Sequence, residues 1–104
     1  MTTPLSENEV EQQLQLKNLN APRLSPTLIS EQIVSEAYYV FPNTTMTVCC
    51  LTLRNGYNVI GESAAASPEN FDADIGKRIA KDNARNKIWA LEGYLLRSKL
   101  AKTI

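Results

Sequence analysis

A polar stripe in the C-terminal third of the chain contains the residue types best suited to binding a ligand. Arg78, Asp82, Arg85 and Trp89 follow one another at intervals of three or four residues, which places them on one face of a helix. Guanidinium groups grip phosphates through paired hydrogen bonds, and an indole ring can stack on a base. The stripe therefore predicts a site for a phosphorylated nucleotide.

Other side chains extend this candidate site. Asn83 and Asn86 flank the stripe, and their amides can read base edges or ribose hydroxyls. Arg54 and Glu62 lie near the two ends of a predicted strand and mark an alternative location for the site if the helix face does not bind the ligand. The complete set of expected ligand-binding residues is Arg54, Phe71, Arg78, Asn83, Arg85, Asn86, Trp89 and Arg97.

The same stripe has a simpler interpretation as an ordinary solvated helix face. Asp82 would then pair with Arg78 and Arg85, each pair contributing only tenths of a kcal/mol, and Trp89 would belong to the core. The sequence leaves both interpretations open.

Catalytic signals are missing from the chain. It contains no histidine, no glycine-rich phosphate loop and no paired-carboxylate motif. Cys49 and Cys50 are adjacent, so on a strand they point to opposite faces, and we expect them to be packing residues rather than a disulfide or a metal site. We expect no enzyme, cofactor or metal; an enzyme would have to use Glu62 or Asp82 as its general base.

These residues must be positioned by a small α+β fold. Met46 to Leu53 alternates, with Thr47, Cys49, Leu51 and Leu53 on the expected core face, and Asn55-Gly56 predicts a two-residue turn with positive φ at both positions. Residues 45–63 therefore form a hairpin, closed by Arg54 and Tyr57. Its two partly apolar faces suggest a sheet covered by helix on one side and by a partner on the other.

Two helices complete the predicted domain of residues 25–104. Ser25-Pro26 starts a short helix near residues 27–37, and Ser67-Pro68 starts a long helix that ends near Lys102. Gly76 and Gly93 lie inside the long helix and indicate close approach of another segment. Its expected core stripe is Phe71, Ile75, Ile79, Ile88, Leu91 and Leu95.

Composition limits the classes of function. Lys and Arg balance Asp and Glu at eleven each, so the basic excess of a non-specific nucleic-acid binder is missing. We expect no membrane span and no signal peptide, and therefore a cytoplasmic protein.

Residues 1–24 are polar and predict a mobile arm or a weak helix. The small core favours a homo-oligomer built from dimers.

The segments "TTMTVCCLTLRNGYNVIGES" and "NFDADIGKRIAKDNARNKIWALEGYLL" resemble the signature of a family of small tailed-phage proteins. That signature combines a Val-Cys hairpin, a Gly-Glu-Ser exit and a helix with Asn-Ala-Arg-x-Lys-Ile-Trp-x-Leu-Glu-Gly-Tyr. The resemblance spans Ser35 to Leu100. Most members are phage proteins of unknown function.

The predicted layout is also similar to that of phage sponges that disarm Thoeris antiviral signalling. This resemblance implies binding of cyclic ADP-ribose isomers or cyclic oligonucleotides, without cleavage, by a homo-oligomer in the host cytoplasm. The alternative is an early phage protein that inhibits a host protein through exposed Tyr38, Tyr39 and Phe41.

Overall fold

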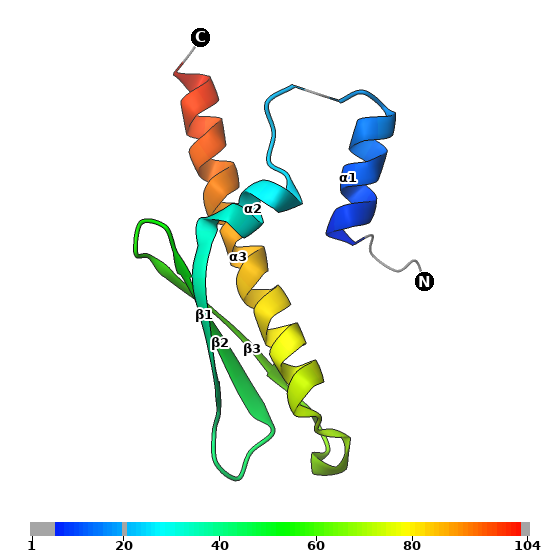
Figure 1. The fold of residues 1–104 in the computed structure, drawn as a ribbon, viewed down its shortest axis with the longest axis vertical. Helices are drawn as coiled ribbons and strands as arrows, with labels where there is room; N and C mark the ends of the chain where they lie inside the picture. Colours follow the sequence, from blue (N-terminus) through cyan, green and yellow to red (C-terminus); the bar gives the residue numbers. More distant parts are fainter. Residues whose placement is uncertain (1–5, 20, 103–104) are drawn as a thin grey trace.

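A three-stranded antiparallel sheet, packed against one long helix, forms the body of the molecule (Figure 1). The computed structural model describes residues 6–19 and 21–102. The strands are β1 (Ile33–Val40), β2 (Met46–Leu53) and β3 (Asn58–Ala64), in the spatial order β1-β2-β3. Helix α3 (Ala73–Ala101) packs against β2 and β3. The expected α+β class, with a small antiparallel sheet on a long C-terminal helix, is confirmed.

The short helix ends earlier than its sequence pattern predicted. Helix α2 (Pro26–Gln32) starts as expected, because the Ser25 side chain accepts a hydrogen bond from the backbone N–H of Leu28 and proline occupies the first turn. The expected continuation to residue 37 is wrong: the chain becomes extended at Ile33 and pairs with β2 along Ile33–Val40. β-Branched and aromatic residues fill this segment, and pairing with a neighbouring strand outweighs its helical spacing.

The hairpin of β2 and β3 is confirmed, but its turn differs from the prediction. The backbone N–H of Leu53 donates to the carbonyl of Tyr57, so three residues form the loop and the expected closing pair of Arg54 and Tyr57 is wrong. Gly56 has φ +89°, whereas Asn55 is not among the residues with positive φ. A three-residue loop needs one left-handed position, which glycine fills without strain.

Helix α3 begins later than expected. Ser67 and Pro68 start only a short 3₁₀ helix, η1 (Pro68–Asn70), and the Ser67 side chain makes no capping hydrogen bond. Asp72 is the N-cap of α3, and its carboxylate accepts a hydrogen bond of 2.9 Å from the backbone N–H of Ile75. Asp72 replaces Ser67 because the chain becomes extended again at Phe71 before the helix starts.

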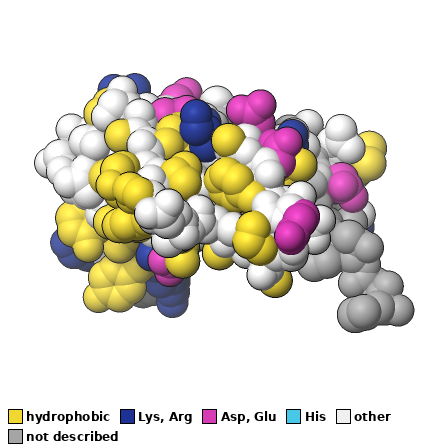
Figure 2. Space-filling view, turned by 90° about the horizontal axis from the view of Figure 1, so that it is seen from below, with side chains coloured by type: hydrophobic (Ala, Val, Ile, Leu, Met, Phe, Trp, Pro, Cys, Tyr) yellow, Lys and Arg dark blue, Asp and Glu magenta, His cyan; other side chains and the backbone are white. Residues whose placement is uncertain are grey.

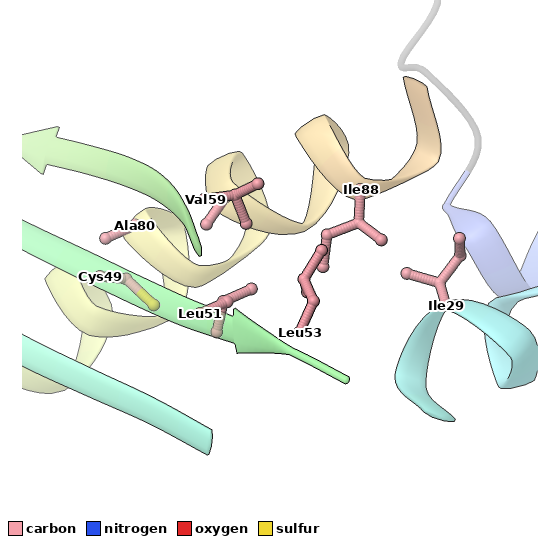
Figure 3. Close-up of a cluster of buried hydrophobic side chains, with 8 residues drawn as sticks. Ile29, Cys49, Leu51, Leu53, Val59, Ala80 and Ile88 are labelled. Carbon is pink, nitrogen blue, oxygen red and sulfur yellow. The ribbon is translucent and has the colours of Figure 1, made fainter. Parts of the chain in front are cut away.

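The core lies between α3 and the sheet and is extended by α2 (Figure 3). β2 supplies Cys49, Leu51 and Leu53 to it, as the alternation predicted, while Cys50 lies half-buried on the opposite face. Both cysteines are free thiols. The buried cluster comprises Ile29, Cys49, Leu51, Leu53, Val59, Ala80, Ala84 and Ile88.

The expected core stripe of α3 is largely wrong. Ile88 is buried, but four of its expected partners are exposed, namely Ile75, Ile79, Leu91 and Leu95. Ala80 and Ala84 face the sheet instead, because α3 crosses β3 at Gly61 almost in backbone contact. A large side chain at either alanine would push the helix away from the sheet.

Glycines inside α3 have different surroundings. A side-chain carbon on Gly76 would lie 3.0 Å from Oγ1 of Thr47, so the close approach predicted there involves β2 of the same chain. At Gly93 the nearest atom, in Leu24, is 3.8 Å away, which is ordinary contact. Neither glycine therefore requires a second subunit.

Helix α1 (Glu7–Leu16) lies beside α2 and buries none of its residues. Seen from below, hydrophobic side chains come to the surface among charged ones rather than staying in the interior (Figure 2). Among the residues that the structure describes, no helix combines the length and hydropathy needed to cross a membrane.

Candidate functional site

Arg85 joins three helices through its guanidinium group. Its Nε lies 2.7 Å and 2.9 Å from the two carboxylate oxygens of Glu7, on α1. Its Nη2 donates to the backbone carbonyl of Pro26, at the start of α2, over 2.8 Å. Only 14% of the Arg85 side chain is exposed, so this ion pair is better shielded than a surface pair.

Trp89 lies one turn further along α3 and shares the same acceptor. Its Nε1–H donates to Oε1 of Glu7 over 2.8 Å, and its ring packs against the core. Burial acts to raise the pKa of Glu7, but the hydrogen bonds from Arg85 and Trp89 and the positive charge of Arg85 outweigh it. The pKa of this carboxyl therefore lies below its ordinary value.

A polar hollow of about 390 Å³ lies next to this ion pair. Helix α3 contributes two guanidinium groups, one amide and one carboxylate to its walls, and the start of α1 contributes a hydroxyl, a carboxylate and a second amide. Such walls can bind phosphate through the arginines and sugar hydroxyls through the amides and Asp82. The lining residues are Ser6, Glu7, Asn8, Arg78, Asp82, Arg85 and Asn86.

The helical stripe predicted from sequence lies together in the structure. Arg78, Asp82 and Arg85 line one hollow with the flanking Asn86, and Trp89 binds the same carboxylate as Arg85. The simpler interpretation assigned Asp82 to Arg85, but the structure pairs Arg85 with Glu7.

Two further expected ligand-binding residues, like Arg85, bind the backbone of their own chain. The Asn83 amide donates to the carbonyl of Glu62 over 2.8 Å and joins α3 to β3. Arg54 donates through Nε to the carbonyl of Glu31, which joins the hairpin loop to α2. These bonds join elements of the fold, and neither residue lines the polar hollow.

The last two expected residues lie away from the polar hollow. Phe71 lines a separate, mainly apolar cavity of about 230 Å³, together with Ser63, Ile75 and Ile79. Arg97 is exposed near the C-terminal end of α3 and lines neither cavity. The eight expected residues thus do not form a single site.

Sequence reasoning missed the contribution of α1. Ser6 caps α1: its hydroxyl oxygen accepts a hydrogen bond from the backbone N–H of Glu9, and the hydroxyl donates to the Glu9 carboxylate. The Ser-x-x-Glu pattern could have located this helix start. No local pattern indicates that Glu7 binds Arg85, 78 residues away.

The aromatic cluster expected on the surface is smaller than predicted. Tyr39 and Phe41 are exposed and meet edge to face, with ring centroids 4.8 Å apart. Tyr38 instead packs against the core, because alternate residues of β1 point to opposite faces of the sheet.

Comparison with known proteins gives one match. Neither a curated protein nor a solved structure matches the chain. The model of the Phage protein (N4 Gp49/phage Sf6 gene 66) family matches residues 24–100, which include the hairpin, α3 and its polar stripe. Because this match covers well over half of the sequence, the chain belongs to the Phage protein (N4 Gp49/phage Sf6 gene 66) family.

Proposed function

We propose that this phage protein binds a cyclic nucleotide immune signal of its host and sequesters it without cleaving it. One observation carries the proposal: Arg78, Arg85 and Asn86 line a single polar hollow, with Trp89 beside it. Guanidinium groups suit the phosphates of such a signal, and amides suit its ribose and base. The resemblance to Thoeris sponges favours cyclic ADP-ribose isomers or cyclic oligonucleotides as the ligand.

Sequestration fits the chemistry of the hollow better than turnover does. The chain has no histidine, and the Glu7 carboxylate is held by Arg85 and Trp89. A general base in the hollow would therefore have to be Asp82, with no histidine beside it. The hollow holds about 390 Å³, near the lower end of the roughly 300–1,000 Å³ typical of small-molecule pockets. A dimer that completes it from a second subunit is part of the proposal, as is action in the host cytoplasm.

Isothermal calorimetry with cyclic ADP-ribose isomers and cyclic di- and trinucleotides tests this function. Arg78→Ala is the sharpest variant, because Arg78 lines the hollow but does not hold Glu7. Loss of one charge-assisted hydrogen bond, about 1.5–3 kcal/mol, predicts roughly ten- to hundredfold weaker binding. Arg97→Ala removes the same charge far from the hollow and serves as the control. Arg85→Lys should bind the ligand more weakly than the wild type but more tightly than Arg85→Ala, since lysine keeps the charge but loses the planar fork.

Two results would contradict the proposal. If the wild-type protein gives no heat with any of these ligands, sequestration is wrong. If the ligand recovered after denaturation is cleaved, the protein is an enzyme. Light scattering at micromolar concentration separately tests the proposed dimer.

A second candidate function is inhibition of a host protein. It is favoured by Tyr39 and Phe41, two exposed aromatic rings in contact, since such residues anchor many protein interfaces. A host protein retained by the wild type and lost with Tyr39→Ser would support this function. Retention of a small molecule by both the wild type and Tyr39→Ser would support sequestration.

A further inference from the structure

The Glu7 carboxylate occupies the donors that the proposed ligand needs. Both of its oxygens accept from Arg85 Nε, at 2.7 Å and 2.9 Å, and Oε1 also accepts from Trp89 Nε1 at 2.8 Å. A carboxylate and a phosphate present the same kind of anionic oxygen to such donors. The chain therefore fills its own anion-binding position with a side chain from α1.

Among the residues that the structure describes, few other contacts hold α1 on the body of the protein. None of its residues is buried, and Val10 is 42% exposed. Its second ion pair, between Glu11 and Arg23, leads to the connecting segment rather than to α3 or the sheet. A cavity of about 260 Å³ separates parts of α1 from Leu24 and Trp89, so the apolar contact between them is loose.

We propose that α1 is a displaceable strap, and that its Glu7 carboxylate competes with a phosphate of the ligand for Arg85 and Trp89. The identity of the ligand rests on the function proposed above; the competition itself concerns any phosphate. A phosphate reaches these two donors only when Glu7 has withdrawn from them, so the measured affinity at this position is the intrinsic affinity multiplied by the fraction of molecules in which Glu7 is withdrawn, here called open. Removing the charge of Glu7 increases that fraction.

Glu7→Gln in the full-length chain tests the strap. Glutamine keeps the shape of the side chain but removes its charge, and the fold remains because α1 lies outside the buried core. Glu9→Gln is the matched control: it changes the same charge on the same helix, where the Glu9 side chain bonds to Ser6 and not to α3. Both variants are titrated with pyrophosphate, which contains the phosphate chemistry without a nucleoside.

The chain provides its own reporter. Trp89 is its single tryptophan, and its indole N–H is bonded to Glu7. Loss of this bond changes the fluorescence of Trp89, so strap opening is observed independently of binding heat. We expect Glu7→Gln to shift the emission in the absence of ligand. If the variant is fully open, a strap closed in about 90% of wild-type molecules corresponds to pyrophosphate binding about tenfold more tightly by Glu7→Gln than by the wild type. Glu9→Gln should behave like the wild type in both measurements.

Three results would overturn the strap. Equal affinity of Glu7→Gln and the wild type means that Glu7 does not compete, and weaker binding by Glu7→Gln means that Glu7 holds Arg85 in place for the ligand instead of competing with it. Absence of pyrophosphate binding in every protein means that the donors form no anion site. The cyclic nucleotide function is judged separately by calorimetry on the wild type, so either idea can fail while the other stands.

Discussion

Gly61 lies at the closest contact between the long helix and the sheet, and Gly61→Ala should disrupt it. A methyl group at this position would lie 2.1 Å from the backbone nitrogen of Ala84 and 2.2 Å from the backbone oxygen of Ala80. Ordinary contacts of a carbon atom are about 3.5–4.0 Å. The obstacles are backbone atoms, which no rotamer change can move, so α3 must retreat by more than about 1 Å.

The loss of stability follows from that displacement. Inserting extra atoms into a packed core costs about 1–3 kcal/mol where side chains can rearrange. Here α3 itself must move away from Cys49, Leu51 and Val59, so we expect a loss of at least about 3 kcal/mol. For a domain of this size, about 4–8 °C of melting temperature is lost per kcal/mol. Gly61→Ala should therefore melt at least about 12 °C below the wild type.

Thermal unfolding followed by circular dichroism measures this change, with Gly56→Ala as the control. Gly56 has φ +89° and no atom within 4 Å of an added methyl group. Its replacement introduces only backbone strain, about 1–2 kcal/mol. If Gly61→Ala melts within about 4 °C of the wild type, or above Gly56→Ala, then α3 does not lie on β3 as closely as the structure shows.

Three further predictions concern single side chains. The hydroxyl of Thr47 is buried with no hydrogen-bond partner among the described residues, so Thr47→Val should leave the melting temperature unchanged or raise it by the equivalent of about 1 kcal/mol. Burial raises the pKa of the Cys49 thiol, so iodoacetamide should modify Cys50 in the native protein and Cys49 only on unfolding, as mass spectrometry can show. The lowered pKa of Glu7 stabilises the folded state above the unfolded value of 4.5, and this contribution should disappear as the pH falls through the lower folded value. Melting temperatures between pH 6 and pH 3, compared with those of Glu7→Gln, measure that contribution; parallel curves would contradict it.

Strong local signals in the sequence predicted much of the fold. Period-two alternation identified β2 and its core face, and Asn55-Gly56 located the hairpin turn to within one residue of its true closing pair. β1 was missed because Leu28, Ile29 and Ile33 fit helical spacing. The strand forms there because its backbone pairs with β2, and a partner strand is information that a local window does not contain.

The core face of α3 could not be read from hydrophobicity. The largest apolar residues of the helix predicted a stripe through Ile75 and Ile79, but the helix turns Ala80 and Ala84 to the sheet. Close packing on Gly61 leaves room only for small side chains. The helix therefore buries two alanines against the sheet, although alanine is less hydrophobic than the isoleucines that were expected there. Which face of α3 is buried depends on Gly61, a residue of β3. The periodicity of the helix contains no information about that residue.

The candidate site shows the same division between local and distant information. Helical spacing alone predicted that Arg78, Asp82 and Arg85 lie together at one hollow, because neighbours on a helix face stay neighbours in the fold. The flanking Asn86 lines the same hollow. Helical spacing could not separate these residues from Asn83, whose amide is used by a backbone carbonyl of β3. Nor could helical spacing identify Glu7, because its contact with Arg85 joins two helices that are distant in the sequence.

Helix α3 therefore presents three kinds of surface. Its alanines allow close contact with the sheet, and Arg85 and Trp89 hold α1 through Glu7. A third set of side chains, which includes Leu91 and Tyr94, remains exposed beside a groove of about 560 Å³ that also borders β3. The proposed dimer thus has a better basis in these exposed apolar residues than in Gly76, which contacts its own sheet.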